Sequence, residues 1–340
     1  MWRWRWLLLL FLVNPSCVVP MVNHDSPGED LAASKPRPNL LFPTWGGKQL
    51  WSDWRWRAGW RIQENVLTGH HRVLDPQDRR HAWGSWEACL TEFERLAPAA
   101  QEHGDGHLVV LLHGMGRGRS ALAGLHQGLQ EQGFTVAALT YPSTRRSIAE
   151  HVLQLESVLA HIEGFREVSF VTHSLGGVVV RELLAPARVP LSGQEESQAP
   201  TAAYWRTHLQ ARRIVMIAPP NQGSAFAQKM ERFAPFAWIF GETGLSLTPQ
   251  AMANVPVPAI PVLIIAGARG TDGAWNPWLE SPNDGVVSVA ETHLAGETDH
   301  LIVDNIHTFL MNDPATIAAT ARFLAGGCHF EDLDVRPAHD

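Results

Sequence analysis

The chain has 340 residues, of which 45% are hydrophobic and 18% are charged, and its formal net charge is -7. This composition predicts a globular protein with one large core or two modest cores. The acidic balance argues against a nucleic-acid-binding protein, because phosphate contacts need a basic face.

The first residues have the layout of an export signal. Arg3 and Arg5 precede an apolar run from Trp6 to Val13, which is too short to span a bilayer. Cys17 hints at lipoprotein-type acylation. We therefore expect residues 1–20 to be a signal or membrane-targeting segment of an extracytoplasmic protein; the alternative is an apolar tail or misassigned start on a cytoplasmic one.

Two segments of distinct composition follow. Residues 21–44 are rich in Pro, Ser, Asn and Asp, which is typical of a linker. Residues 45–100 are rich in Trp and Arg without a steady helical or strand period, and cation–π pairs between these side chains are expected. We expect this extension to pack on the main domain; contact with a lipid surface is the alternative.

Strand and helix patterns alternate through residues 101–327. Short apolar runs predict buried parallel strands, and apolar residues at spacings of three and four predict helices. This alternation predicts an α/β fold with a mostly parallel sheet, helices on both faces and ligands at the carboxyl ends of the strands. The predicted strands are 107–114, 134–141, 168–173, 213–220 and 260–267, and the predicted helices are about 120–132, 148–162, 175–184 and 314–327.

Two inserts, at 186–208 and 224–256, interrupt this rhythm, and residues 328–340 form a C-terminal tail. The second insert contains "FAPFAWIF", which could cover an active site as a lid or form an ordinary buried helix. Cys89 and Cys328 could pair as a disulfide in an oxidising compartment or remain two separate thiols.

The stretch "THSLGG" places Ser174 directly after a predicted central strand and before a helix. A turn this tight would make the side chain project from the sheet edge, and it needs small residues two before and two after the serine. Gly176 meets one half of that requirement, and Thr172 departs from the other. Serine becomes a useful nucleophile only when a base takes its proton and a third group orients that base.

Upstream, "HGMGRGRS" follows the first strand of the series. Its glycines let a backbone N–H, that of Met115, turn towards a developing negative charge, with the Leu175 N–H as second donor. The alternative is a loop that cradles phosphate, but the segment has neither a lysine nor the full phosphate-binding pattern.

Together, His113-Gly114, the Ser174 elbow with His173 and Gly176, and the later "NDGVVSV" and "HTFLM" resemble the lipase and esterase branch of the α/β-hydrolase superfamily. The resemblance covers roughly Leu108 to Gly327. It implies the α/β-hydrolase fold and a catalytic triad in the chain order Ser, Asp, His.

For the acid, Asp284 in "NDGVVSV" matches the family's acid loop, and Asp272 in "RGTDGAW" is the competitor. For the base, His307 precedes the last helix, where a hydrolase histidine loop belongs, and His300 is the alternative. His173 would pack against the sheet and need not titrate.

The resemblance therefore implies a serine hydrolase of carboxylic esters with an apolar acyl group, acting on a small-molecule or lipid ester through an acyl-enzyme. No cofactor or metal is expected, since no Cys or His cluster has a zinc spacing. An amide or thioester hydrolase, including a serine peptidase, is left open, as is a non-catalytic membrane-associated binding protein with a decayed elbow.

Overall fold

The computed structural model describes residues 49–100, 106–186, 204–224, 247–269 and 276–338. Helices in these ranges are all too short or too polar to span a bilayer. The export segment 1–20, the linker 21–44, "FAPFAWIF", Asp272 and most of both inserts lie outside the described residues, so those expectations stay predictions.

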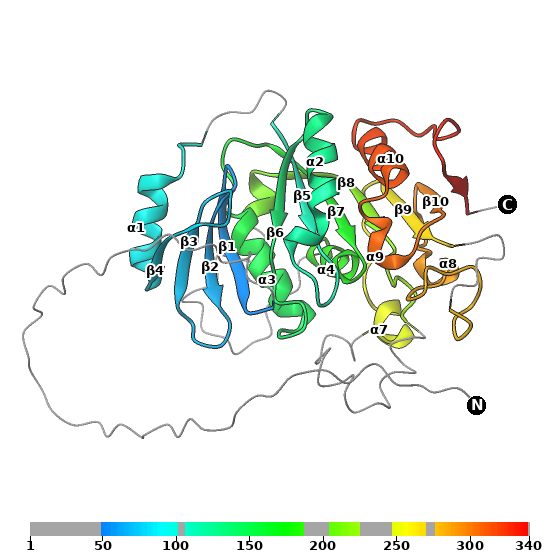
Figure 1. The fold of residues 1–340 in the computed structure, drawn as a ribbon, viewed down its shortest axis with the longest axis horizontal. Helices are drawn as coiled ribbons and strands as arrows, with labels where there is room; N and C mark the ends of the chain where they lie inside the picture. Colours follow the sequence, from blue (N-terminus) through cyan, green and yellow to red (C-terminus); the bar gives the residue numbers. More distant parts are fainter. Residues whose placement is uncertain (1–48, 101–105, 187–203, 225–246, 270–275, 339–340) are drawn as a thin grey trace, which may run out of the picture. The chain divides into compact units, whose positions relative to one another are not determined.

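Strands and helices alternate along most of the chain (Figure 1). In chain order the elements are β1 (Trp51–Arg57), β2 (Trp60–Asn65), β3 (His71–Leu74), β4 (Arg80–Gly84), α1 (Trp86–Leu96), β5 (His107–Leu112), η1 (Arg119–Leu122), α2 (Ala123–Glu131), β6 (Thr135–Leu139), α3 (Ile148–Leu159), β7 (Glu167–His173), α4 (Leu175–Leu183), η2 (Tyr204–Thr207), β8 (Gln210–Ile217), α7 (Pro249–Ala253), β9 (Val262–Gly267), α8 (Val289–Thr292), β10 (Asp299–Val303), α9 (His307–Leu310), α10 (Pro314–Leu324) and β11 (Arg336–Pro337).

The main sheet has seven strands in the order β11-β10-β9-β8-β7-β5-β6. Every neighbouring pair is parallel except β10 with β11. The predicted α/β fold with a mostly parallel sheet is therefore confirmed. The residues that the sequence assigns to a C-terminal tail contribute β11, and Phe330 from the same segment is buried in the core.

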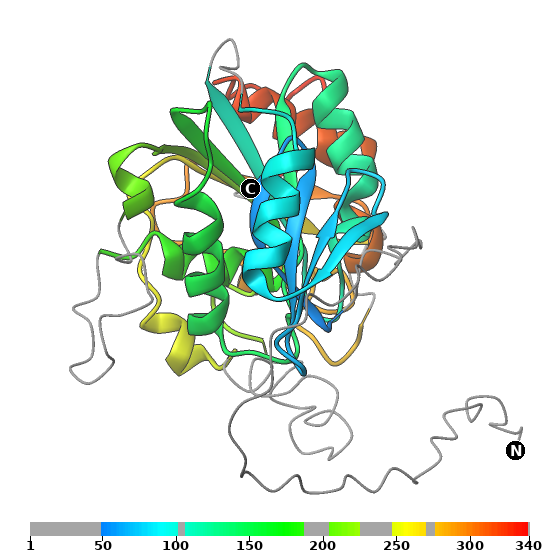
Figure 2. The same ribbon diagram turned by 90° about the vertical axis from the view of Figure 1, so that its left-hand side faces the viewer.

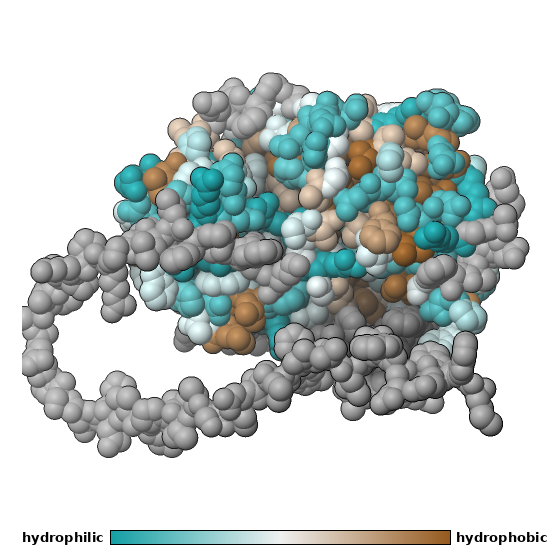
Figure 3. All heavy atoms as spheres, in the orientation of Figure 1, coloured by the Kyte–Doolittle hydropathy of each residue, from teal (hydrophilic) through white to brown (hydrophobic). Residues whose placement is uncertain are grey.

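Both faces of this sheet are covered, which explains the continuous apolar runs of its strands. Alternate residues of β5 enter different cores: Leu108 and Val110 face α3 and α4, whereas Val109 and Leu111 face α2 and α10. Figure 2 shows these helices on the two sides of the sheet. The surface in Figure 3 is mostly hydrophilic, with small hydrophobic patches.

The Trp/Arg-rich extension forms a separate four-stranded antiparallel sheet, β1-β2-β3-β4, followed by α1. No strand period was visible here because buried and half-buried positions do not alternate along β1 and β2. The expected cation–π pairs are present: Arg72 lies 3.7 Å from the Trp51 ring centroid, and Arg55 lies 4.8 Å from that of Trp86.

The extension contacts the main domain through buried polar groups. Asp53, which is fully buried, donates its backbone N–H to the Thr140 carbonyl at 3.0 Å and accepts the Thr140 N–H at 2.6 Å through Oδ2. Its other carboxylate oxygen accepts from Gln63 at 2.7 Å and lies 3.9 Å from Nε of buried Arg61. These bonds join β1 to the loop that follows β6.

Cys89 is buried in α1 and Cys328 is exposed, and both are free thiols. Burial raises the pKa of the Cys89 thiol to about 11. A disulfide between the two is therefore absent from the described part of the chain.

Candidate active site

Ser174 occupies the junction between β7 and α4 in a strained conformation. Its φ of 52° and ψ of -121° lie in a region that residues with a Cβ rarely adopt. The backbone N–H of Ser174 donates to the Ile217 carbonyl of β8 at 2.8 Å, and its side chain caps no helical N–H. The half-exposed hydroxyl is thus left available at the carboxyl end of a central strand.

Small neighbours make this turn possible. A Cβ on Gly176 would lie only 2.9 Å from the Leu112 carbonyl oxygen of β5, so only glycine fits there. Thr172, which departs from the expected small residue, is accommodated. Its hydroxyl donates to the Val215 carbonyl at 3.3 Å, and its side chain faces Gly177, which has no side chain to clash with it.

Asp284 and His307 come from different loops and form a hydrogen-bonded pair. His307 Nδ1 lies 2.7 Å from Asp284 Oδ2, and the His307 backbone N–H donates to the Asp284 carbonyl at 3.0 Å. Asp284 Oδ1 accepts the N–H groups of Val286 and Val287 at 2.9 and 2.8 Å. Because a carboxylate only accepts, Nδ1 carries the proton and Nε2 presents a lone pair.

Of the competing residues, His300 does not contact the Asp284 carboxylate, and Asp272 lies outside the residues that the structure describes. His300 is buried within β10, where its Nδ1 lies 2.9 Å from Glu297 Oε1. Within the described part of the chain, the imidazole that contacts the Asp284 carboxylate is that of His307.

His173 connects the elbow to the histidine loop. Its ring centroid lies 4.6 Å from that of His307, and its Nε2–H donates to the His307 carbonyl oxygen at 3.1 Å. Complete burial, reinforced by the nearby His307, keeps the pKa of His173 well below its ordinary value. His173 is therefore a neutral packing residue that joins the backbone of His307 to the elbow.

The glycine loop after β5 lies against the elbow. A Cβ on Gly114 would be 2.7 Å from His173 Nδ1 and 3.1 Å from the Ser174 Cβ, so glycine allows this close approach. Over the described ranges, the backbone N–H groups of Met115 and Leu175 have no hydrogen-bond acceptor. Both N–H groups are therefore donors that a ligand could use.

His113 supports this glycine loop from the protein interior. It is fully buried, stacks on Tyr141 with ring centroids 4.3 Å apart, and donates from Nδ1 to the Gly114 carbonyl at 2.9 Å. Burial lowers the pKa of His113 to about 4, so the ring is neutral near pH 7.

Gln49 also holds the loop, and sequence reasoning did not single it out. Its amide N–H donates to the Arg117 carbonyl at 2.6 Å, and its oxygen accepts the Thr144 N–H at 3.0 Å. The Ser143 hydroxyl, 3.1 Å from the Gln49 amide, accepts the Gly116 N–H at 3.0 Å. No motif could have revealed Gln49, because its contacts are with residues 68 to 95 positions away.

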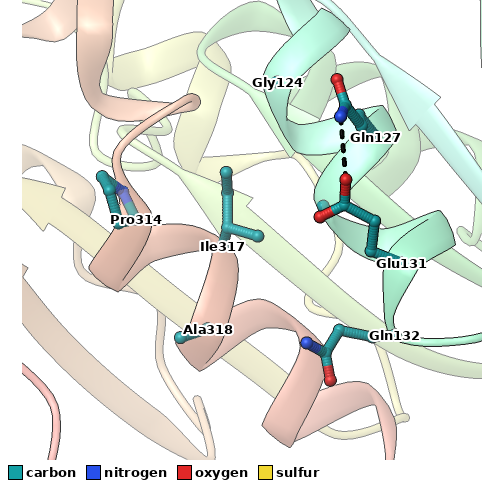
Figure 4. Close-up of a pocket in the computed structure, with 8 residues that line it drawn as sticks. Gly124, Gln127, Glu131, Gln132, Pro314, Ile317 and Ala318 are labelled. Carbon is teal, nitrogen blue, oxygen red and sulfur yellow. Dashed lines mark hydrogen bonds between the residues drawn. The ribbon is translucent and has the colours of Figure 1, made fainter.

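Across the described residues, no hydrogen bond joins the Ser174 hydroxyl to His307. A pocket is present elsewhere, between α2 and α10, with Ile317 on one side and a Gln127–Glu131 hydrogen bond of 2.8 Å on the other (Figure 4). None of its lining residues belongs to the elbow or to the acid and histidine loops.

A comparison with protein families shows to which family the chain belongs. The model of the alpha/beta hydrolase family matches residues 109–334, which include Ser174, Asp284 and His307. The chain belongs to the alpha/beta hydrolase family. A search of curated proteins found no match.

Solved structures share this alpha/beta hydrolase fold at low identity. The mature lipase BlEst2 from Bacillus licheniformis is 18% identical with a TM-score of 0.50, over 67% of this chain and 95% of that one. The propeptide form of the same lipase is also 18% identical, with a TM-score of 0.52, over 67% of this chain and 53% of that one. Lipase 1 from Pelosinus fermentans is 14% identical, with a TM-score of 0.49, over 66% of this chain and 100% of that one. The two BlEst2 structures, at 18% identity, show a likeness of fold alone.

Proposed function

We propose that the chain is a serine hydrolase of carboxylic esters, with Ser174 as nucleophile, His307 as general base and acid, and Asp284 as the group that orients His307. The observation that carries the proposal is the strained elbow at Ser174, whose neighbour His173 contacts His307 of a His–Asp pair joined at 2.7 Å. Strain of this kind persists only where the surrounding fold maintains it, and it gathers at functional sites.

In this mechanism, His307 Nε2 takes the Ser174 hydroxyl proton as the serine oxygen attacks the acyl carbonyl. The oxyanion accepts hydrogen bonds from the Met115 and Leu175 N–H groups. His307 returns the proton to the leaving alcohol, which leaves an acyl-enzyme that water hydrolyses by the same steps. The missing bond from Ser174 to His307 fits this scheme, since catalytic hydrogen bonds often tighten only in the substrate complex.

Exposed aromatic side chains favour an apolar acyl group. Trp278, in the loop before Asp284, is 67% exposed, and Phe309, two residues after His307, is 60% exposed. Exposed large apolar side chains that lie close in sequence to the acid and the base suit a water-insoluble substrate. A lipid ester or a small apolar ester is the substrate class that this surface supports.

The non-catalytic alternative loses its main support in this geometry. It relied on Thr172 as the mark of a decayed elbow, yet the Thr172 side chain is fully accommodated beside Gly177. An amide or thioester hydrolase would use the same residues, so the leaving group has to be tested directly.

Covalent labelling with a fluorophosphonate probe, followed by peptide mapping, tests the nucleophile. We expect labelling at Ser174 that disappears in Ser174→Ala, slows strongly in His307→Ala and persists in the control Ser157→Ala, whose serine lies on α3. A folded wild-type protein without label at Ser174 would contradict the proposal.

Turnover of p-nitrophenyl esters of increasing acyl length, compared with the matching anilides and thioesters, then tests the substrate class. We expect ester hydrolysis to exceed anilide hydrolysis and to rise with chain length. Preferential anilide hydrolysis would identify a peptidase-like enzyme instead.

A further inference from the structure

A second cluster of polar side chains lies in the segment between Asp284 and His307. His293 follows α8, Glu297 lies in the next turn, and His300 is the second residue of β10. The Nδ1 atoms of His293 and His300 lie 3.0 and 2.9 Å from Glu297 Oε1 and 3.1 Å from each other. Two ring nitrogens and one carboxylate oxygen thus form a triangle with sides of 2.9 to 3.1 Å.

The hydrogen bonds around His300 fix its tautomer. The Thr292 hydroxyl donates to the Val289 carbonyl at 2.6 Å, so its oxygen is left to accept from His300 Nε2, 3.0 Å away. A neutral His300 that donates from Nε2 carries a lone pair on Nδ1. That lone pair would face the Glu297 carboxylate oxygen at 2.9 Å, an arrangement that is repulsive unless a proton or a metal ion lies between the two atoms.

The spacing of the three atoms matches a metal centre. Zn²⁺ binds imidazole nitrogen at about 2.0–2.1 Å and carboxylate oxygen at about 2.0–2.2 Å, which places neighbouring ligand atoms roughly 3.3 Å apart in a tetrahedron. The observed separations of 2.9 to 3.1 Å need only a small expansion.

We propose that His293, Glu297 and His300 form a binding site for one divalent transition-metal ion, with Zn²⁺ as the preferred occupant. Two imidazoles and one carboxylate are a ligand set that suits Zn²⁺. The His293 side chain is 35% exposed, so water can supply the fourth ligand. The spacing His-x3-Glu-x2-His differs from the Cys and His spacings of common zinc motifs, so the sequence alone does not indicate a metal site here.

Surrounding groups hold these ligands in place, as the outer contacts of metal sites do. Thr292 orients the His300 ring, and the Leu294 N–H donates to Glu297 Oε2 at 2.8 Å, which leaves Oε1 directed at the histidines. A bound ion would tie the end of α8 to β10, the strand that leads to His307. It would therefore stabilise the segment that carries the acid and the base.

Metal binding is tested on the full chain, purified without a polyhistidine tag and treated with dipicolinate. We expect isothermal titration with Zn²⁺ to give one site per chain and added Zn²⁺ to raise the melting temperature. Substituting Co²⁺ should give the visible absorption of a tetrahedral nitrogen–oxygen centre.

Variants assign the site. His293→Ala, whose side chain is partly exposed and therefore dispensable for folding, should lose the site and the thermal shift. Thr292→Val keeps the side-chain shape and should weaken Zn²⁺ binding about 10–100-fold. His81→Ala removes a His–carboxylate pair of 2.9 Å that lacks a second imidazole, and it should bind Zn²⁺ like the wild type.

Two results would overturn the proposal. One is a folded wild-type protein with no stoichiometric Zn²⁺ binding, which would mean that a protonated His300 forms an ion pair with Glu297 instead. The other is undiminished binding by His293→Ala. Neither result depends on ester hydrolysis, so the proposed function stands or fails separately.

Discussion

Ser174 carries local backbone strain that should be measurable as stability. Its conformation costs of order 1–3 kcal/mol for a residue with a Cβ, whereas glycine adopts it freely. We expect Ser174→Gly to be more stable than Ser174→Ala by about 1 kcal/mol, after the greater entropy of glycine in the unfolded chain is subtracted. Urea unfolding of the two inactive variants measures the difference, and equal midpoints would argue against strain at the elbow.

Asp284 should matter through the tautomer of His307. In Asp284→Asn, the amide oxygen would accept the Val286 and Val287 N–H groups, and the amide NH2 would face His307 Nδ1. His307 would then carry its proton on Nε2 and could not act as a base. We expect kcat to fall by about 10⁴ with little change in KM. A loss below tenfold would exclude Asp284 as the orienting acid.

At the scale of elements, Gln49 bridges the glycine loop and the loop after β6. Removing its amide frees the Arg117 carbonyl and the Thr144 N–H, so the Met115 N–H loses its fixed direction. We expect Gln49→Ala to lower kcat about tenfold, a fraction of the loss when an oxyanion donor itself is removed, with KM nearly unchanged. Steady-state kinetics measure this.

An exposed glutamine provides the control for Gln49. Gln127→Ala on α2 should keep wild-type kinetics, since Gln127 bonds only to Glu131 among the described residues. If Gln49→Ala raised KM and left kcat intact, Gln49 would contribute to substrate binding and not to the geometry of the oxyanion loop.

Elements differ in how far the sequence reveals them. The parallel strands were predictable because burial on both faces makes them continuously apolar, as in β5 and β9. The strands of the extension were not, since polar residues such as Asp53 and Arg61 are buried there and erase the alternation. β10 was missed because only Leu301, Ile302 and Val303 form its apolar run.

The sequence also revealed only part of the candidate site. Ser174 is marked by its neighbours in sequence, and family resemblance pointed to Asp284 and His307. The contacts that hold the site, from Gln49 and from the Thr172 hydroxyl to Val215, depend on residues brought together only by the fold.

At the scale of the whole molecule, buried charges join the extension to the hydrolase domain. In Asp53→Ala, the buried Thr140 N–H and the Gln63 amide lose their acceptor, and Arg61 keeps Asp78 as its remaining ion-pair partner. We expect the free energy of unfolding to fall by about 1–3 kcal/mol for each buried donor that is left without an acceptor. Urea denaturation measures the loss. Asp332→Ala, which breaks an exposed pair with Arg322, should leave the unfolding midpoint nearly unchanged. Equal losses of unfolding free energy in the two variants would show that the buried Asp53 contacts stabilise the protein no more than an exposed ion pair does.

Global stability should also depend on pH through Glu156 of α3. Burial raises the pKa of the Glu156 carboxyl from 4.5 to about 7, with nearby Arg206 opposing the shift. Between these two values the unfolded chain has lost this proton and the folded chain retains it. Folding therefore takes up a proton, and the contribution of Glu156 to stability falls as pH rises from 4.5 to about 7 and is constant above that.

Glu156→Gln removes this dependence because the amide stays neutral. We expect the variant to match the wild type near pH 4.5 and to exceed it in melting temperature at pH 8. The difference between the two curves isolates Glu156, since buried histidines such as His113 and His151, whose pKa burial lowers to about 4, contribute equally to both. Glu131→Gln, at an exposed position on α2, should follow the wild type. A difference that shrinks as pH rises would mean that Glu156 is stabilised as a carboxylate by Arg206.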